Sequence, residues 1–382
     1  MRRLILASIS GEIVLKSDRT RPRFEKRLLA NLEDALKSNN VNYSSTWIEQ
    51  ARLYIDTEDP KALRVCSRVF GIHWATLAEE IRFKGLEDLA EETAKIASSW
   101  VKGRRFAVRA RRAGHHDFTS MDVARIVGSK LLPYSNGVDL DEPEVEVHVE
   151  VRGDKAYIYK DLVRGPDGLP IGVEGRAIVL FSGGLDSPVA AWYTAKRGVE
   201  VDFLHMILAT EESAKDAEDV AKILASEWLY GYRPRLLVAD FRYVVGLIAA
   251  KVRPEYRQVV LRVAMYSYAE RLAEKEGYNA IVTGESLGQV SSQTLRNLEA
   301  ITIVAKITKP ILRPLIGFDK EEIVEKARAI GTYERSSKTR EYCRLGAEAA
   351  TTRASPKILE KEYSKIADAL DHVELVSVKA LR

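Results

Sequence analysis

The residues best suited to carry chemistry lie at the end of an apolar run. Ala177–Phe181 (AIVLF) leads directly into Ser182–Ser187 (SGGLDS), and a helix-like stretch opens with Pro188. Glycines let the backbone curl closely around an anion, and a helix N-terminus supplies free N–H groups and a partial positive charge. Asp186 would repel phosphate unless a bound Mg²⁺ stood between them. The alternative is a structural turn with a Ser/Asp cap.

A second polar string and a cysteine add to this. Thr283–Thr294 (TGESLGQVSSQT) follows another apolar strand, which is the position of a nucleotide-binding edge in an open α/β sheet. Further on lies Cys343, between Arg340 and Arg344, whose charges favour a thiolate. A thiolate or persulfide is a soft nucleophile. An inert, buried cysteine is the alternative, and it is the reading that fits Cys66, which has apolar neighbours.

The composition limits the class of protein to which the chain can belong. The chain has 382 residues, of which 46% are apolar and 30% charged, as in a globular protein of two or three domains. No apolar run approaches the roughly 20 residues that span a bilayer, so we expect no membrane contact and a cytoplasmic protein. Two cysteines cannot form a disulfide framework. Basic clusters at 16–27 and 102–112 favour a phosphate backbone, although a solvated arginine-rich face explains them equally well.

The elements that must position these residues fall into three groups. We predict an α+β domain at 1–60, a second at 61–165, and an α/β domain at 173–382. The first two hold strands at 4–9, 51–56, 105–110, 144–151 and 155–160, and helices at 22–37, 60–70, 86–101 and 119–131. Arg152–Asp154 marks a hairpin turn. Beyond the glycine- and proline-rich stretch 165–172, strands at 176–181, 200–206, 235–239 and 279–283 alternate with helices at 187–197, 212–228, 254–276 and 319–330. That alternation predicts a parallel sheet covered by helices on both faces.

Taken together, these strings resemble the tRNA 4-thiouridine synthetases (tRNA sulfurtransferases). Ser182–Ser187 resembles the PP-loop of ATP pyrophosphatases, which cut ATP between its α and β phosphates, and lacks the Gly-Lys-Ser/Thr end of a Walker loop. Glu12–Lys16 resembles the family's ferredoxin-like domain, and Phe106–Arg112 its RNA-binding THUMP domain. The resemblance implies that the C-terminal domain is a PP-loop ATP pyrophosphatase of the adenine nucleotide alpha hydrolase-like fold.

The resemblance also assigns residues. It implies catalytic roles for Asp186 and Cys343, and it implies nucleotide contacts at Leu180, Phe181, Ser182, Gly183, Gly184, Asp186, Ser187, His205, Met206, Arg262, Gly284 and Gln293. His205 also fits a satisfied core histidine, and Lys309 and Arg313 are further phosphate candidates. The chain departs from the family after His205, where Met206–Thr210 (MILAT) replaces a Ser-Pro-Pro turn. The sequence ends at Arg382 without a second cysteine after Cys343, so we expect neither a rhodanese domain nor a protein-bound metal site.

The implied reaction is adenylation of O4 of a tRNA uridine by ATP with Mg²⁺, followed by replacement of that oxygen with sulfur. The implied partners are tRNA, a sulfur donor (a cysteine desulfurase or inorganic sulfide) and, by analogy, a second copy in a homodimer. Two alternatives remain. One is another PP-loop tRNA enzyme that forms 2-thiouridine or lysidine, and the other is a THUMP RNA-binding protein with a vestigial ATP site.

Overall fold

A computed structural model describes residues 2–339, 345 and 350–382. The chain divides into two compact units, Met1–Asp167 and Gly168–Arg382. The division falls inside the glycine-rich stretch 165–172, where the chain is closely packed. A Cβ on Gly165 would lie 2.2 Å from the carbonyl oxygen of Ile72. Within the described part of the chain, no helix combines the length and apolarity needed to cross a membrane.

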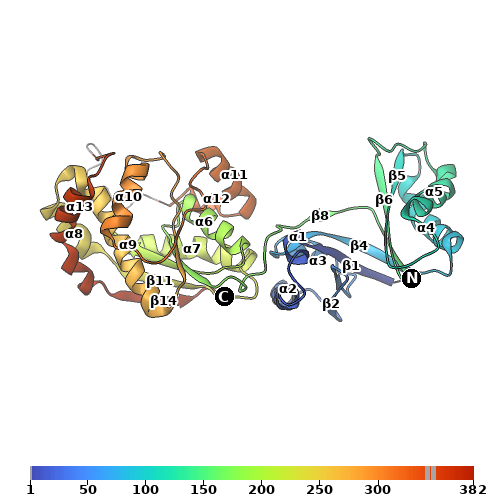
Figure 1. Cartoon of the computed structure of the whole chain (residues 1–382), viewed down its shortest axis with the longest axis horizontal. Coiled ribbons are helices and arrows are strands. Elements are labelled where there is room, and N and C mark those ends of the chain that lie inside the picture. Colours follow the sequence, from blue (N-terminus) through green and yellow to red (C-terminus); the bar gives the residue numbers. More distant parts are fainter. Residues whose placement is uncertain (1, 340–344, 346–349) are drawn as a thin grey trace. The chain divides into compact units, whose positions relative to one another are not determined.

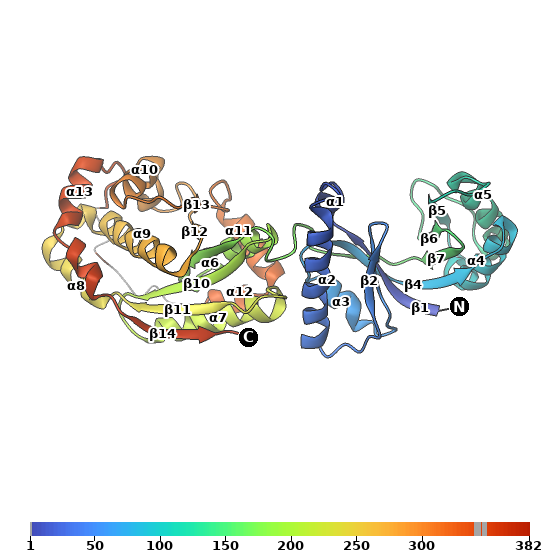
Figure 2. The same ribbon diagram turned by 60° about the horizontal axis from the view of Figure 1, so that its bottom comes forward.

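The first unit is built on one sheet with the strand order β2-β3-β1-β4-β7-β6-β5, and β8 also pairs with β4. Its strands are β1 (Arg2–Ile9), β2 (Thr46–Glu49), β3 (Arg52–Ile55), β4 (Ile72–Arg82), β5 (Phe106–Ala113), β6 (Val145–Arg152), β7 (Lys155–Tyr159) and β8 (Val163–Arg164). Its helices are α1 (Gly11–Val14), α2 (Arg21–Ser38), α3 (Lys61–Cys66), α4 (Leu86–Val101), α5 (Ser120–Leu131) and the short η1 (Leu132–Tyr134). Helices α2 and α3 pack beside β1 to β3, and α4 and α5 pack on β5 to β7 (Figures 1 and 2).

The predicted hairpin is confirmed. β6 and β7 pair antiparallel, and Arg152 lies opposite Lys155. Gly153 at the turn has φ +57°, which a glycine adopts without strain. The sequence pattern does not predict β4, the strand that joins the two halves of this sheet by pairing with β1 on one side and β7 on the other.

The second unit has a sheet of order β13-β12-β9-β10-β11-β14. Its strands are β9 (Arg176–Leu180), β10 (Glu200–Ile207), β11 (Arg235–Asp240), β12 (Ala280–Val282), β13 (Ile311–Leu312) and β14 (Leu375–Ala380). Its helices are α6 (Asp186–Lys196), α7 (Glu212–Glu227), α8 (Arg242–Lys251), η2 (Pro254–Tyr256), α9 (Arg257–Glu276), η3 (Ser291–Gln293), α10 (Leu295–Val304), α11 (Lys320–Ile330), α12 (Tyr333–Ser336), α13 (Pro356–Ser364) and η5 (Ala367–His372). The pairings are parallel except for the edge strand β14.

The predicted two-sided cover of this sheet is confirmed. Helices α6 and α7 pack on one face, and α9 lies on the other (Figures 1 and 2). Because side chains alternate along a strand, Ile178 and Leu204 belong to the core on the α9 side, together with Val259 and Ala264 of α9 itself. The C-terminal ends of the five parallel strands therefore meet at one edge, where both polar strings begin.

A cluster of charged residues and tyrosines stabilises this sheet at the N-terminal ends of its strands. Asp202 of β10 is fully buried. One of its oxygens accepts hydrogen bonds from the hydroxyl of Tyr232 at 2.9 Å and the backbone N–H of Arg235 at 2.7 Å. The other accepts from Arg235 Nε at 3.1 Å, Arg176 Nη2 at 3.3 Å and the hydroxyl of Tyr278 at 2.6 Å. Every lone pair of the carboxylate is thus occupied.

Replacing Asp202 with asparagine should lower the free energy of unfolding by about 3–5 kcal/mol, because it leaves two arginines without their shared buried counter-charge. Chemical denaturation of the full chain measures this. The Asp154→Asn variant is a suitable control, since Asp154 pairs with Arg82 on the surface and both side chains are more than half exposed. A similar small loss in both variants would contradict the structural role of Asp202.

Candidate active site

The Ser182–Ser187 loop connects β9 to α6 at the C-terminal edge of the second sheet, as the sequence predicts. The backbone N–H of Ser182 donates to Ser187 Oγ at 3.2 Å, and the N–H of Gly184 donates to Ser182 Oγ at 3.2 Å. Gly183 has φ +78°, and a Cβ at this position would lie 2.9 Å from Cα of Ala217 in α7. The loop therefore needs glycine here, and it presents the N-terminus of the 11-residue helix α6 to an anion.

The second polar string packs directly on this loop. A Cβ on Gly284 would lie 2.9 Å from the carbonyl carbon of Asp186 and 3.0 Å from the backbone nitrogen of Ser187. Two strings about 100 residues apart in the sequence thus form one surface, and the absence of a side chain at Gly284 is what allows the contact.

Asp186 has two partners that the list of predicted contacts did not include. Its carboxylate accepts from Lys320 Nζ at 3.2 Å and from Gln289 Nε2 at 3.3 Å. Lys320 is the first residue of α11 and is about half exposed, and the Oε1 atom of Gln289 is buried without a partner in the described structure. Gln289 stands in the Thr283–Thr294 string and Lys320 in the predicted helix 319–330, but nothing in the sequence pairs either of them with Asp186.

Arg262 and Gln293, both predicted contacts, lie together beside a buried carboxylate. Arg262 donates from Nε to Ser292 Oγ at 3.0 Å and from Nη1 to Glu285 Oε1 at 2.9 Å. With its amide oriented to satisfy both neighbours, Gln293 accepts from Arg262 Nη2 at 3.3 Å. Arg313 donates from Nε to the other oxygen of Glu285 at 2.8 Å. In this site the guanidinium groups of Arg262 and Arg313 therefore both bind the carboxylate of Glu285.

The side chains of Phe181, His205 and Met206 are buried, and that of Leu180 is partly buried. His205 has protein partners on both ring nitrogens: Nδ1 donates to the carbonyl oxygen of Phe181 at 2.9 Å, and Nε2 lies 3.0 Å from Ser213 Oγ, whose hydroxyl is also 2.9 Å from the carbonyl oxygen of Thr210. The imidazole thus supports the backbone one residue before the loop. We infer that a ligand would contact these strand ends mainly through their backbone, and that His205 holds this backbone in place.

Burial lowers the pKa of His205 below the ordinary 6.5, outweighing the opposite effects of the Phe181 carbonyl and of Asp216. The unfolded chain takes up a proton near pH 6.5 where the folded protein does not, so acid favours unfolding. We expect the free energy of unfolding to fall as the pH drops from about 6.5 towards the lowered pKa. Denaturation of the His205→Gln variant should show a shallower fall over this range, and an unchanged pH dependence would contradict the prediction.

Cys343, with Arg340 and Arg344, lies outside the described residues. Thr339, four positions earlier, donates from Oγ1 to the carbonyl oxygen of Gly183 at 3.1 Å, so the last described residue before Cys343 contacts the Ser182–Ser187 loop. Cys66 is fully buried in α3, and burial raises the pKa of its thiol to about 12. Its reading as a core residue is confirmed.

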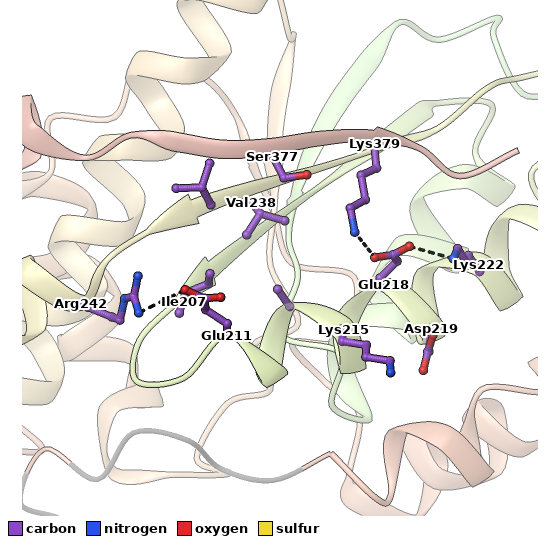
Figure 3. Close-up of a pocket in the computed structure, with 12 residues that line it drawn as sticks. Ile207, Glu211, Lys215, Glu218, Asp219, Lys222, Val238, Arg242, Ser377 and Lys379 are labelled. Atoms are coloured by element: carbon purple, nitrogen blue, oxygen red, sulfur yellow. Dashed lines mark hydrogen bonds and ion pairs between the residues drawn. The ribbon is translucent and has the colours of Figure 1, made fainter.

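Figure 3 shows a pocket of about 530 Å³ in the second unit, away from the Ser182–Ser187 loop. It lies between α7 and the edge of the sheet formed by β11 and β14. Glu218 stands between Lys222, at 2.7 Å, and Lys379, at 2.5 Å. The lining residues are Ile207, Glu211, Ala214, Lys215, Glu218, Asp219, Lys222, Val238, Arg242, Val376, Ser377 and Lys379. None of the predicted contacts lines this pocket, and its charges largely pair with one another.

In the first unit, the predicted basic stretch 102–112 includes β5. Arg105 pairs with Asp139 at 2.6 Å and Arg109 with Glu146 at 2.7 Å, whereas Lys102, Arg104 and Arg111 are exposed. The acidic partners neutralise part of the cluster. Its exposed members remain available to a phosphate backbone.

Known proteins match nearly the whole chain. Family models match at residues 5–76 (ThiI ferredoxin-like domain), 83–161 (THUMP domain) and 172–367 (thiamine biosynthesis protein, ThiI). A tRNA sulfurtransferase of Desulfurococcus amylolyticus is 48% identical over 94% of this chain and 75% of its own length. A probable tRNA sulfurtransferase of Sulfurisphaera tokodaii is 42% identical over 97% of this chain and all of its own.

Solved structures agree with these sequence matches. The crystal structure of a 4-thiouridine synthetase–RNA complex with bound ATP superposes with a TM-score of 0.83 at 29% identity, covering 99% of this chain and 100% of that one. PH1313 from Pyrococcus horikoshii follows with a TM-score of 0.67 at 27% identity, covering 86% and 99%.

Proposed function

The chain belongs to the ThiI family, whose curated members include tRNA sulfurtransferases, and we propose that it is a tRNA uridine 4-sulfurtransferase. It would adenylate O4 of a tRNA uridine with ATP and replace that oxygen with sulfur to give 4-thiouridine. The observation that carries the proposal is the Ser182–Ser187 loop, which leads into the 11-residue helix α6 and has Gly284 packed directly against it. This arrangement stands in one chain with a THUMP domain at 83–161.

The loop suits the triphosphate of ATP. The N–H groups at the start of α6 and the hydroxyls of Ser182 and Ser187 would bind the β and γ phosphates, with Gly183 and Gly184 allowing close approach. Arg262, Gly284 and Gln293 complete this side. Leu180, Phe181, His205 and Met206 form the strand ends where the adenosine would lie, as the family resemblance implies.

Mg²⁺ fits this donor set as a companion of ATP. Among the described residues, no three acidic, histidine or cysteine side chains are grouped to hold a metal. Mg²⁺ is commonly held by one or two carboxylates together with substrate phosphates, and Asp186 is the carboxylate that the loop provides. Bound there, the ion would offset phosphate charge, and Lys320 would be released from Asp186 to the phosphates.

The chemistry then runs in two steps. The uridine O4 attacks the α-phosphorus, the bond from this phosphorus to the bridging oxygen breaks, and pyrophosphate leaves. Sulfur carried on Cys343, or delivered beside it, attacks C4 and displaces AMP. Where the sulfur arrives as a persulfide of Cys343, a thiol must supply two electrons to free the product from the cysteine.

The partners follow from this reaction. tRNA would be gripped by the first unit through phosphates and shape. The sulfur donor would be a cysteine desulfurase or sulfide, the enzyme would act in the cytoplasm where its substrate lies, and we propose a homodimer by analogy with related enzymes.

The first experiment is mass spectrometry of nucleosides from unmodified tRNA incubated with the protein, ATP–Mg²⁺ and sulfide. We expect 4-thiouridine. Release of pyrophosphate together with 2-thiouridine, or with lysidine in a parallel incubation that contains lysine, would assign another PP-loop reaction. Absence of pyrophosphate release would favour an RNA-binding protein with a vestigial ATP site.

A further inference from the structure

We propose that Glu285 is a positioning residue that directs a pair of guanidinium groups, those of Arg262 and Arg313, towards the polyphosphate of ATP. The inference rests on the proposed ATP chemistry of the loop. It adds to that site a second arginine and the carboxylate that holds both.

The carboxylate of Glu285 is more deeply buried than the two guanidinium groups that it binds. Glu285 Oε1 accepts from Arg262 Nη1 at 2.9 Å, and Oε2 accepts from Arg313 Nε at 2.8 Å. The Glu285 side chain is only 3% exposed, whereas those of Arg262 and Arg313 are 24% and 20% exposed. The carboxylate therefore lies behind the arginines, and the arginines are the part of the cluster that solvent or a ligand can reach.

The carboxylate is held in one conformation from three elements. Besides Arg262 of α9 and Arg313 after β13, the hydroxyls of Tyr266 (2.5 Å) and Thr283 (3.0 Å) donate to Oε2. Burial alone would raise the pKa of Glu285, but Arg262, Tyr266 and Arg313 together hold it below its usual range. One fixed negative charge facing two positive charges leaves a net charge of one positive unit for an anionic ligand.

The cluster also lies next to the phosphate loop. Glu285 follows Gly284, the glycine in contact with Asp186 and Ser187. The two arginines differ in how much donor capacity remains. Arg262 is bound through Nε, Nη1 and Nη2, whereas Arg313 is bound to Glu285 through Nε, lies beside the hydroxyl of Tyr266, and makes one long contact of 3.5 Å from Nη2 to Thr302. Arg313 is thus the arginine with N–H groups available to a phosphate.

The test is the Glu285→Gln variant, assayed for tRNA-dependent pyrophosphate release and, by calorimetry, for ATP affinity. A glutamine keeps one acceptor oxygen and turns an NH2 donor towards the second arginine, so at least one of the two guanidinium groups loses its fixed direction. We expect kcat/KM for ATP to fall about 10²-fold, mainly through KM, with the affinity for tRNA unchanged. Glu362→Gln is the matched control. Glu362 of α13 is another buried glutamate, 3% exposed, and it is bound to Arg253 and Lys365 instead.

A double-mutant cycle separates positioning from general stability. If Glu285 acts through Arg313, then Glu285→Gln should cost much less in the Arg313→Gln background than alone. Full additivity of the two losses would overturn the proposal, and so would a Glu285→Gln enzyme that matches Glu362→Gln in ATP affinity. If Glu285→Gln does not fold, Arg313→Gln alone must weaken ATP binding, and unchanged binding would refute the inference. A wild-type protein that binds ATP but releases no pyrophosphate would instead refute the proposed function.

Discussion

Replacement of Asp186 by alanine is expected to abolish tRNA-dependent pyrophosphate release, with a fall of about 10³-fold in rate, while tRNA affinity is retained. Asp186 opens α6 and is the loop's carboxylate, paired with Lys320 and Gln289. Without it, the triphosphate would lose its companion cation and Lys320 would lose its anchor. The measurement is pyrophosphate release with unmodified tRNA, beside a tRNA-binding titration on the same variant.

The chain offers a close control for this prediction. Asp240 ends β11 at the same edge of the sheet, is 26% exposed against 28% for Asp186, and likewise pairs with a cation, Arg242. Asp240→Ala should therefore leave pyrophosphate release near the wild-type rate. Intact turnover in the Asp186→Ala variant would refute the assignment of the loop as the phosphate site.

Elements with clear periodicity were predictable, and those that depend on tertiary context were not. α4 was predicted at 86–101 and is found there, because its apolar residues follow one helical face. β4 was missed because Ala75–Glu80 contains two alanines and two glutamates, residues that are depleted in strands. This segment is strand because it is central, with β1 and β7 on either side. The edge strand β14 was missed too, and its exposed Val376 and Val378 gave no core-facing alternation.

The residues of the candidate site also divide into those that the sequence predicts and those that depend on the tertiary structure. Gly183 was predictable because a turn with φ +78° selects glycine locally, whereas Gly284 was implied by the resemblance and owes its need for glycine to the contact with Asp186 and Ser187. The partners of Asp186 and the role of Glu285 were not predictable, since a contact between residues 186 and 320 or between 285 and 313 depends on how strands assemble. For His205, the resemblance implied a nucleotide contact, and the structure shows a buried imidazole with two protein partners.

The second large effect concerns the sulfur step. The Cys343→Ser variant should release pyrophosphate with tRNA but form no 4-thiouridine when a cysteine desulfurase and cysteine supply the sulfur. A serine hydroxyl is a far weaker nucleophile than a thiolate at neutral pH and cannot carry a persulfide. Adenylation depends on the loop, where Gly183 and Asp186 remain in place. The two readouts, pyrophosphate and 4-thiouridine, should therefore separate in this variant and fall together in Asp186→Ala.

The other cysteine of the chain supplies the control. Cys66 is buried in the first unit with its thiol pKa raised to about 12, so it is protonated at neutral pH. Cys66→Ala should keep both readouts, apart from a modest loss of stability from the small cavity. Because the sequence contains two cysteines, this pair of variants accounts for every thiol in the protein. Formation of 4-thiouridine by Cys343→Ser under these conditions would show that sulfur reaches the adenylated uridine without this cysteine.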